Sequence, residues 1–156
     1  MIKEEIKDNL FKTDIIALCH GCNTKGAMHA GIANYFRLLF PEMYLAYRDL
    51  CKEKKFDAGD CFLYQHRNKE TGQLEKIIGN LGTQVNPGPD AKLEHVEESL
   101  RNFFGQLTDQ FQVFEVAMPR IGCGIGGLEW EGSGNVKELI DRVSTDYNIK
   151  VTIYYL

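Results

Sequence analysis

Short apolar runs alternate along this chain with longer segments in which apolar residues recur every three or four positions. The runs are typical of buried strands, and they occupy residues 15–19, 60–65, 76–81, 114–118 and 150–155. The periodic segments predict helices over residues 30–40, 42–54, 91–107 and 135–147. This alternation favours an α/β architecture, in which helices cover both faces of a mixed, mostly parallel sheet.

Turn-forming residues separate these elements. Pro41 ends the first helix, and the polar stretch 67–73, which contains Gly72, predicts a hairpin loop between two strands. The sequence Asn-Pro-Gly-Pro-Asp at residues 86–90 is the strongest loop signal in the chain, and a helix is expected directly after it.

Composition narrows the classes of function. A chain of 156 residues is expected to form one domain, residues 1–156. Its net charge of −4, without a basic run, argues against general nucleic-acid binding. No apolar run reaches membrane-spanning length, and the charged N-terminus does not resemble a secretory signal. Five scattered cysteines indicate reduced thiols, so we expect a cytoplasmic protein.

Two glycine-bearing loops follow predicted strands. Residues 118–130 read MPRIGCGIGGLEW, and residues 20–32 read HGCNTKGAMHAGI. Glycine lets backbone N–H groups approach a ligand closely, so a glycine-rich loop between a strand and a helix suits a phosphate. Ligands of α/β sheets bind at the carboxyl ends of the strands. Two such loops therefore predict a site that grips a diphosphate from opposite sides.

These loops resemble those of the macrodomains, which bind ADP-ribose and related nucleotides, and the resemblance covers nearly the whole chain. It is strongest to the compact branch with the ADP-ribose-1″-phosphate phosphatase and the terminal ADP-ribose glycohydrolases. The resemblance implies a three-layer α/β/α fold, ADP-ribose or a derivative as ligand, and no metal or cofactor. ADP-ribosylated macromolecules are possible partners, and a monomer is expected.

The resemblance also implies binding roles. Asn9 and Leu10 would follow the first strand and contact adenine, where the amide oxygen of Asn9 can accept a hydrogen bond. Asn23 would lie near the distal ribose. Backbone N–H groups of two segments would form the walls of the diphosphate groove: Ala30, Gly31 and Ile32 on one side, and Gly122, Cys123, Gly124, Ile125 and Gly126 on the other.

Two residues are candidates for catalysis. His20 is expected at the end of a strand beside Asn23, in the position of a histidine in the phosphatase, where an imidazole can act as nucleophile or acid–base. The alternative role of His20 is to hydrogen-bond the loop or a ribose hydroxyl. Asp90, in the proline-glycine loop, is a candidate acid–base partner of His20. Its alternative role is that of an ordinary acid at the start of a helix.

The sequence departs from the glycohydrolase pattern at two positions. Where those enzymes have a lysine and an aspartate, this chain has Gln84 and Gly126. A glutamine amide cannot form a covalent sugar adduct, and glycine offers no acid or base. We therefore expect an ADP-ribose-1″-phosphate phosphatase. The alternatives are a module that binds ADP-ribose without turnover, and a deacylase or de-ADP-ribosylating hydrolase.

Overall fold

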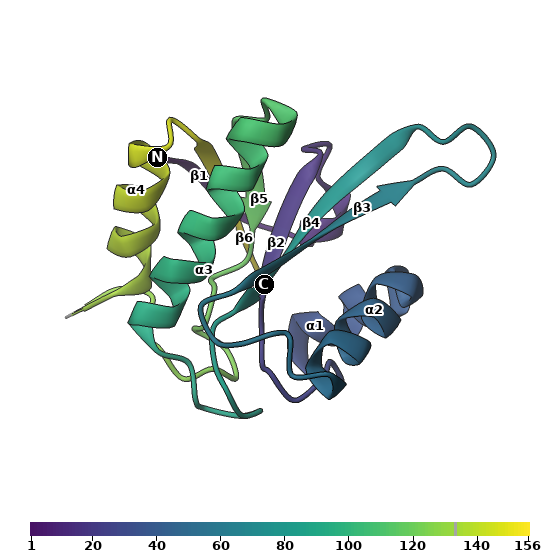
Figure 1. Cartoon of the computed structure of the whole chain (residues 1–156). Helices are drawn as coiled ribbons and strands as arrows, with labels where there is room; N and C mark the ends of the chain where they lie inside the picture. Colours follow the sequence, from purple (N-terminus) through teal and green to yellow (C-terminus); the bar gives the residue numbers. More distant parts are fainter. Residues whose placement is uncertain (133) are drawn as a thin grey trace.

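The computed structural model describes residues 1–132 and 134–156 (Figure 1). Its centre is a six-stranded sheet with the order β1-β6-β5-β2-β4-β3. All neighbouring strands are parallel except β3 and β4, which form an antiparallel hairpin. The strands are β1 (Ile2–Lys7), β2 (Ala17–Cys22), β3 (Cys61–Arg67), β4 (Leu74–Gly82), β5 (Glu115–Met118) and β6 (Lys150–Tyr155).

Helices cover both faces of the sheet, so the fold is the expected three-layer α/β/α arrangement (Figure 1). The helices are α1 (Gly31–Leu39), α2 (Pro41–Lys52), α3 (Leu93–Gln106) and α4 (Val136–Asp146). A 3-10 turn, η1 (Leu10–Lys12), follows β1, and a π-helical turn, η2 (Leu107–Phe111), extends α3.

Each face of the sheet has its own apolar core, since side chains along a strand alternate between the two faces. On one face Phe103 and Ile140 come from α3 and α4 and pack with Cys19 of β2. On the other face Phe36 and Tyr47 come from α1 and α2. In α3 the apolar periodicity of the sequence coincides with the buried side chains, whereas in α1 only Phe36 is buried and Leu39 is exposed.

The main difference from the sequence-based prediction lies in β2. The apolar run predicted a strand over residues 15–19, whereas β2 begins at Ala17 and continues to Cys22. The strand runs on because every residue from Ala17 to Cys22 pairs with β4. His20, expected where the strand ends, therefore lies within the strand and opposite Asn80.

Close packing of α3 on the sheet depends on Gly79 of β4. A Cβ atom at this position would lie 2.7 Å from the ring of Phe103, which is fully buried. Real Cβ atoms do not approach other atoms so closely. The absence of a side chain at Gly79 therefore lets the aromatic ring of α3 rest directly on the backbone of β4.

The substitution Gly79→Ala is expected to lower the free energy of unfolding by about 1–3 kcal/mol, because overpacking forces Phe103 out of its position. Urea denaturation followed by circular dichroism measures this change. Gly105→Ala in α3 is the matched control, since its new methyl group would meet only Tyr147 at 3.9 Å. This control should be neutral or stabilising by up to about 1 kcal/mol, because alanine favours the helix.

Candidate functional site

The candidate site lies where the loops after β2, β4 and β5 meet, at the carboxyl ends of these parallel strands (Figure 1). The loop after β4 joins the other two. On one side, the Thr24 N–H donates to the carbonyl of Val85 at 3.1 Å. On the other side, the Ala91 N–H donates to the carbonyl of Gly126 at 3.2 Å. The two predicted ligand loops are therefore held by one shared segment.

Asn23 organises the loop that follows β2. Its side-chain oxygen accepts from the Lys25 N–H at 2.9 Å, and its amide nitrogen donates to the carbonyl of Ala27 at 2.9 Å. The hydroxyl of Tyr47, from α2, donates to the Asn23 carbonyl at 2.6 Å. Asn23 is only 8% exposed, so its amide serves the shape of the loop, and a ribose hydroxyl would compete with these bonds.

The first wall of the predicted groove is the N-terminus of α1. Ala30 stands at the N-cap without a side-chain hydrogen bond, and the first turn carries no acidic residue. Such a helix end leaves backbone N–H groups unsatisfied and its dipole uncompensated, and both effects favour an anion. Gly31 and Ile32, for which the resemblance implies contacts to the diphosphate, begin α1 at this helix end.

The second wall is a tight turn built on Gly122 and Gly126. Gly122 has a φ of +73°, and its carbonyl accepts from the Leu128 N–H at 2.8 Å. A Cβ on Gly126 would lie 2.7 Å from the Gly122 carbonyl oxygen and 2.9 Å from the Cβ of Ala91. No side chain fits there, so this turn requires glycine at position 126 and cannot accommodate the aspartate of the glycohydrolases.

The remaining residues of the second loop differ in exposure. The Cys123 thiol is half-buried and donates to the Ile121 carbonyl at 3.3 Å, and burial raises its pKa to about 11. It therefore stays protonated near neutral pH. Gly124 lies beside open space. Ile125 is 51% exposed, and its Cδ1 lies 3.2 Å from where a Cβ of Gly31 would stand. The side chain of Ile125 therefore lies near the start of α1.

The predicted adenine contacts lie at η1. The side-chain oxygen of Asn9 accepts from the Phe11 N–H at 2.9 Å and caps this turn, while Leu10 is buried beneath it. An amide oxygen has two lone pairs, so Asn9 retains one for a ligand amine. Leu10 can contribute to a ligand site only through its backbone, since 3% of the residue is exposed.

His20 is sealed inside the core, which contradicts its expected place at the ligand surface. Its ring stacks on Phe36 of α1 with centroids 3.9 Å apart, and its Nε2 lies 2.8 Å from the side-chain oxygen of Asn80. No part of the residue is exposed. Burial lowers the pKa of His20 to about 4, so the ring is neutral near pH 7. We therefore assign His20 a structural role.

Asp90 lies in the loop shared by both walls. Its carboxylate accepts from the Asn86 N–H at 2.9 Å, and this hydrogen bond lowers its pKa. Asp90 is therefore ionised near neutral pH and partly exposed. Gln84 orders the same loop, because its amide nitrogen donates to the carbonyls of Asn86 at 2.6 Å and Gly88 at 2.8 Å.

Two supporting residues escaped the sequence-based prediction. Tyr47 reads as a core aromatic of α2, and nothing in its helical spacing reveals that its hydroxyl holds Asn23. Trp130 is 8% exposed, and its indole N–H donates to Glu5 at 2.9 Å. This bond fastens the end of the second loop to β1.

The described residues contain no group of three or more His, Cys, Asp or Glu side chains arranged to hold a metal ion. None of the described helices has the length and apolar character needed to cross a membrane.

Stability should depend on pH through His20. The pKa of His20 in the folded chain, about 4, lies below the ordinary value of 6.5. Between these two pH values His20 is protonated in the unfolded chain and neutral in the folded chain. The contribution of His20 to the free energy of unfolding is therefore fully present above about pH 6.5. It is lost as the pH falls toward 4, by about 3 kcal/mol in all. Urea unfolding at a series of pH values measures this loss. In His20→Gln the free energy of unfolding should depend less steeply on pH between 4 and 6.5. An unchanged pH dependence would contradict the burial of a neutral His20.

The tight turn of the second loop should be sensitive to one methyl group. Gly126→Ala is expected to weaken ADP-ribose binding about tenfold or more, because the displaced turn misplaces the N–H groups that face the ligand. It should also lower the free energy of unfolding by about 1–3 kcal/mol. Calorimetric titration and urea unfolding measure the two effects. Gly124→Ala, whose methyl group meets no atom within 4 Å, should leave stability unchanged.

Comparisons with known proteins agree with this geometry. The family model described as "Macro domain" matches residues 19–136. The DNA ADP-ribosyl glycohydrolase of Thermus aquaticus is 28% identical over 96% of this chain, which spans only 40% of that relative. The ADP-ribose 1″-phosphate phosphatase of Candida albicans is 27% identical, covering 88% of this chain and 93% of the relative.

Among solved structures, the macrodomain of Mycobacterium tuberculosis DarG superposes with a TM-score of 0.78 at 28% identity. The match covers 100% of this chain and 98% of that one. The family model matches most of the sequence, and the fold agrees over its whole length. The chain therefore belongs to the macrodomain family.

Proposed function

We propose that this chain binds ADP-ribose between its two loops and hydrolyses a group on the distal ribose, with the 1″-phosphate as the favoured substrate. The observation that carries the proposal is the position of Asp90. An ionised, partly exposed carboxylate lies in a loop that is hydrogen-bonded to both glycine-bearing loops. An ionised carboxylate can accept a proton, so Asp90 is a candidate general base at this place.

The chemistry requires few groups. Asp90 takes a proton from a water molecule as the water oxygen attacks phosphorus. The bond between phosphorus and the ribose oxygen breaks, and that oxygen takes up a proton, so that the products are ADP-ribose and inorganic phosphate. The N–H groups of the uncapped α1 N-terminus and of the second loop hold the anionic diphosphate. Catalysis then comes mostly from positioning.

A covalent glycohydrolase route is disfavoured by the same residues. Gln84 occupies the position of the expected lysine, and its amide nitrogen is engaged by two loop carbonyls. An amide nitrogen is a poor nucleophile, so no sugar adduct forms on it. The packing around Gly126 leaves no room for a carboxylate there.

The burial of His20 favours a second candidate, a module that binds ADP-ribose without turnover. It removes one of the two acid–base groups expected in the groove, so that any catalysis depends on Asp90. The ligand in that case is free ADP-ribose or an ADP-ribosylated macromolecule. The name of the Thermus relative makes ADP-ribosylated DNA a suitable member of the test set.

Asp90→Asn should lower the rate of phosphate release from ADP-ribose-1″-phosphate about a hundredfold or more, since the general base is lost. Its affinity for ADP-ribose should stay within about threefold of the wild type, because no wall of the groove changes. Phosphate release and calorimetric titration measure these quantities. Asp49→Asn, an exposed acid of α2, is the matched control and should retain full activity.

The same assay, followed by mass spectrometry, should include acetylated ADP-ribose and ADP-ribosylated DNA. Turnover of either, without phosphate release, would replace the phosphatase by a deacylase or a de-ADP-ribosylating hydrolase. Binding without turnover of any substrate would establish the binding module. No binding at millimolar ADP-ribose would contradict both candidates.

A further inference from the structure

The two outer strands of the sheet, β1 and β3, differ in how their free edges are protected. β1 reads IKEEIK, with four charged residues among six, and its register is irregular between Ile2 and Glu4. Charges and bulges are the means by which native proteins keep an edge strand from pairing with another chain. Residues 61–65 of β3 read CFLYQ, with neither a charge nor a proline, and the register irregularity of β3 lies beyond them, between His66 and Arg67. Over residues 61–65 the edge of β3 therefore lacks these defences.

The backbone of β3 offers free hydrogen-bonding groups at this edge. At its start, the Gly82 N–H donates to the Asp60 carbonyl at 2.8 Å. Such pairs recur at every second residue of an antiparallel ladder, so Phe62 and Tyr64 direct their backbone groups toward β4. The intervening residues direct theirs away from the sheet, and they are Cys61, Leu63 and Gln65. Within the described residues, no strand lies beyond this edge.

The resemblance implies a monomer, but from this edge we propose that β3 pairs with β3 of a second copy of this chain, antiparallel, about a two-fold axis at Leu63. In this register Leu63 lies opposite Leu63 of the partner subunit, and Cys61 lies opposite Gln65 of the partner subunit. All the outward-facing residues of both strands then exchange backbone hydrogen bonds. The two sheets join into one continuous sheet, and the unprotected edge is removed.

The side chains fit the same register. Phe62 and Tyr64 point to the face that α1 and α2 cover. In this register Phe62 of one subunit lies opposite Tyr64 of the partner subunit. Cross-strand aromatic pairs stabilise sheets. At the ends of the paired segment, the carboxylate of Asp60 lies opposite His66 of the partner subunit. An acid then faces an imidazole, and like charges are not brought together. The strand is thus complementary to itself in both shape and charge.

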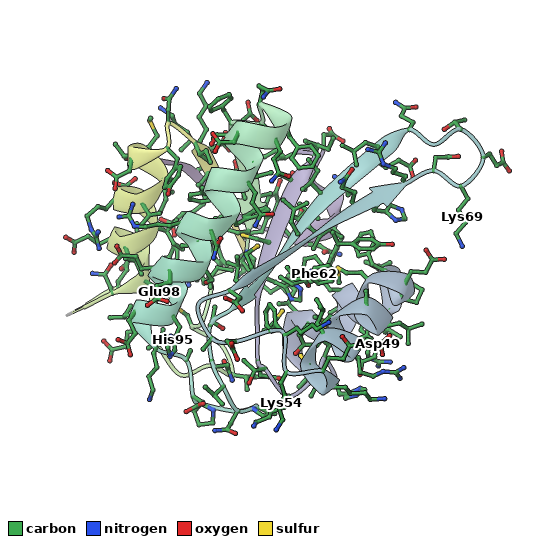
Figure 2. All side chains as sticks on the ribbon, viewed as in Figure 1. Asp49, Lys54, Phe62, Lys69, His95 and Glu98 are labelled. Carbon is green, nitrogen blue, oxygen red and sulfur yellow. The ribbon has the colours of Figure 1, made fainter. Side chains whose placement is uncertain are left out.

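The hairpin leaves the paired segment accessible. Beyond Arg67 the β3–β4 connection extends away from the body of the protein, as Figure 1 shows. Lys69, near its tip, forms an ion pair with Glu42 of α2 at 2.9 Å (Figure 2).

The mass in solution tests the proposal. Light scattering after size-exclusion chromatography should give the dimer mass for the wild type at about 100 μM, a concentration that populates even modest interfaces. Gln65→Pro removes an N–H that points outward, so it should raise the dimer dissociation constant about tenfold or more while leaving the ladder with β4 intact. Gln65→Thr keeps the N–H and should remain dimeric.

A cross-link tests the register independently of any loss of stability. Gln65→Cys should form a disulfide with Cys61 of the partner subunit under mild oxidation, because the Cα atoms of a hydrogen-bonded pair lie about 5.5 Å apart. Adding Cys61→Ser should abolish that cross-link. A wild type that is monomeric at every concentration would overturn the proposal, and so would a dimer that Gln65→Pro does not weaken.

Discussion

The parallel pairing of β2 with β4 is the interaction on which the site depends. All six residues of β2 are in register with β4, so the two strands end side by side. Their following loops then start from neighbouring points, and the Thr24 N–H reaches the carbonyl of Val85. The same pairing draws His20 into the sheet opposite Asn80, where α1 covers it. The pairing of β2 with β4 therefore brings the loops of the predicted groove together and also places the His20 imidazole in the core.

The groove that we propose as the ADP-ribose site presents backbone dipoles, in a protein whose own charge is negative. Its walls are a helix N-terminus without a capping side chain and a turn so tight that Gly126 admits no Cβ atom. Backbone N–H groups are fixed in direction, so they favour a ligand whose oxygens match their spacing. On this proposal, the shape of the diphosphate matters more for recognition than its net charge.

The sequence predicts the architecture and both loops because hydrophobic periodicity and glycine placement are local signals. The last strand, Lys150–Tyr155, agrees at both ends, and the helix boundaries agree within about two residues. The failure at His20 has a non-local cause. An apolar run marks the part of a strand that contacts helices, whereas the length of β2 is decided by its partner β4, which lies far along the sequence. The hydroxyl of Tyr47 on Asn23 is likewise a tertiary contact without a local signal.

The closeness of Ile125 and Gly31 restricts the sequence on both sides of the predicted groove. A Cβ atom at Gly31 would lie 3.2 Å from the Cδ1 of Ile125, and the φ of Gly31, +61°, already disfavours a side chain. A larger residue at position 31 would therefore need a smaller or displaced residue at position 125. The two loops, far apart in the sequence, are thus constrained to vary together.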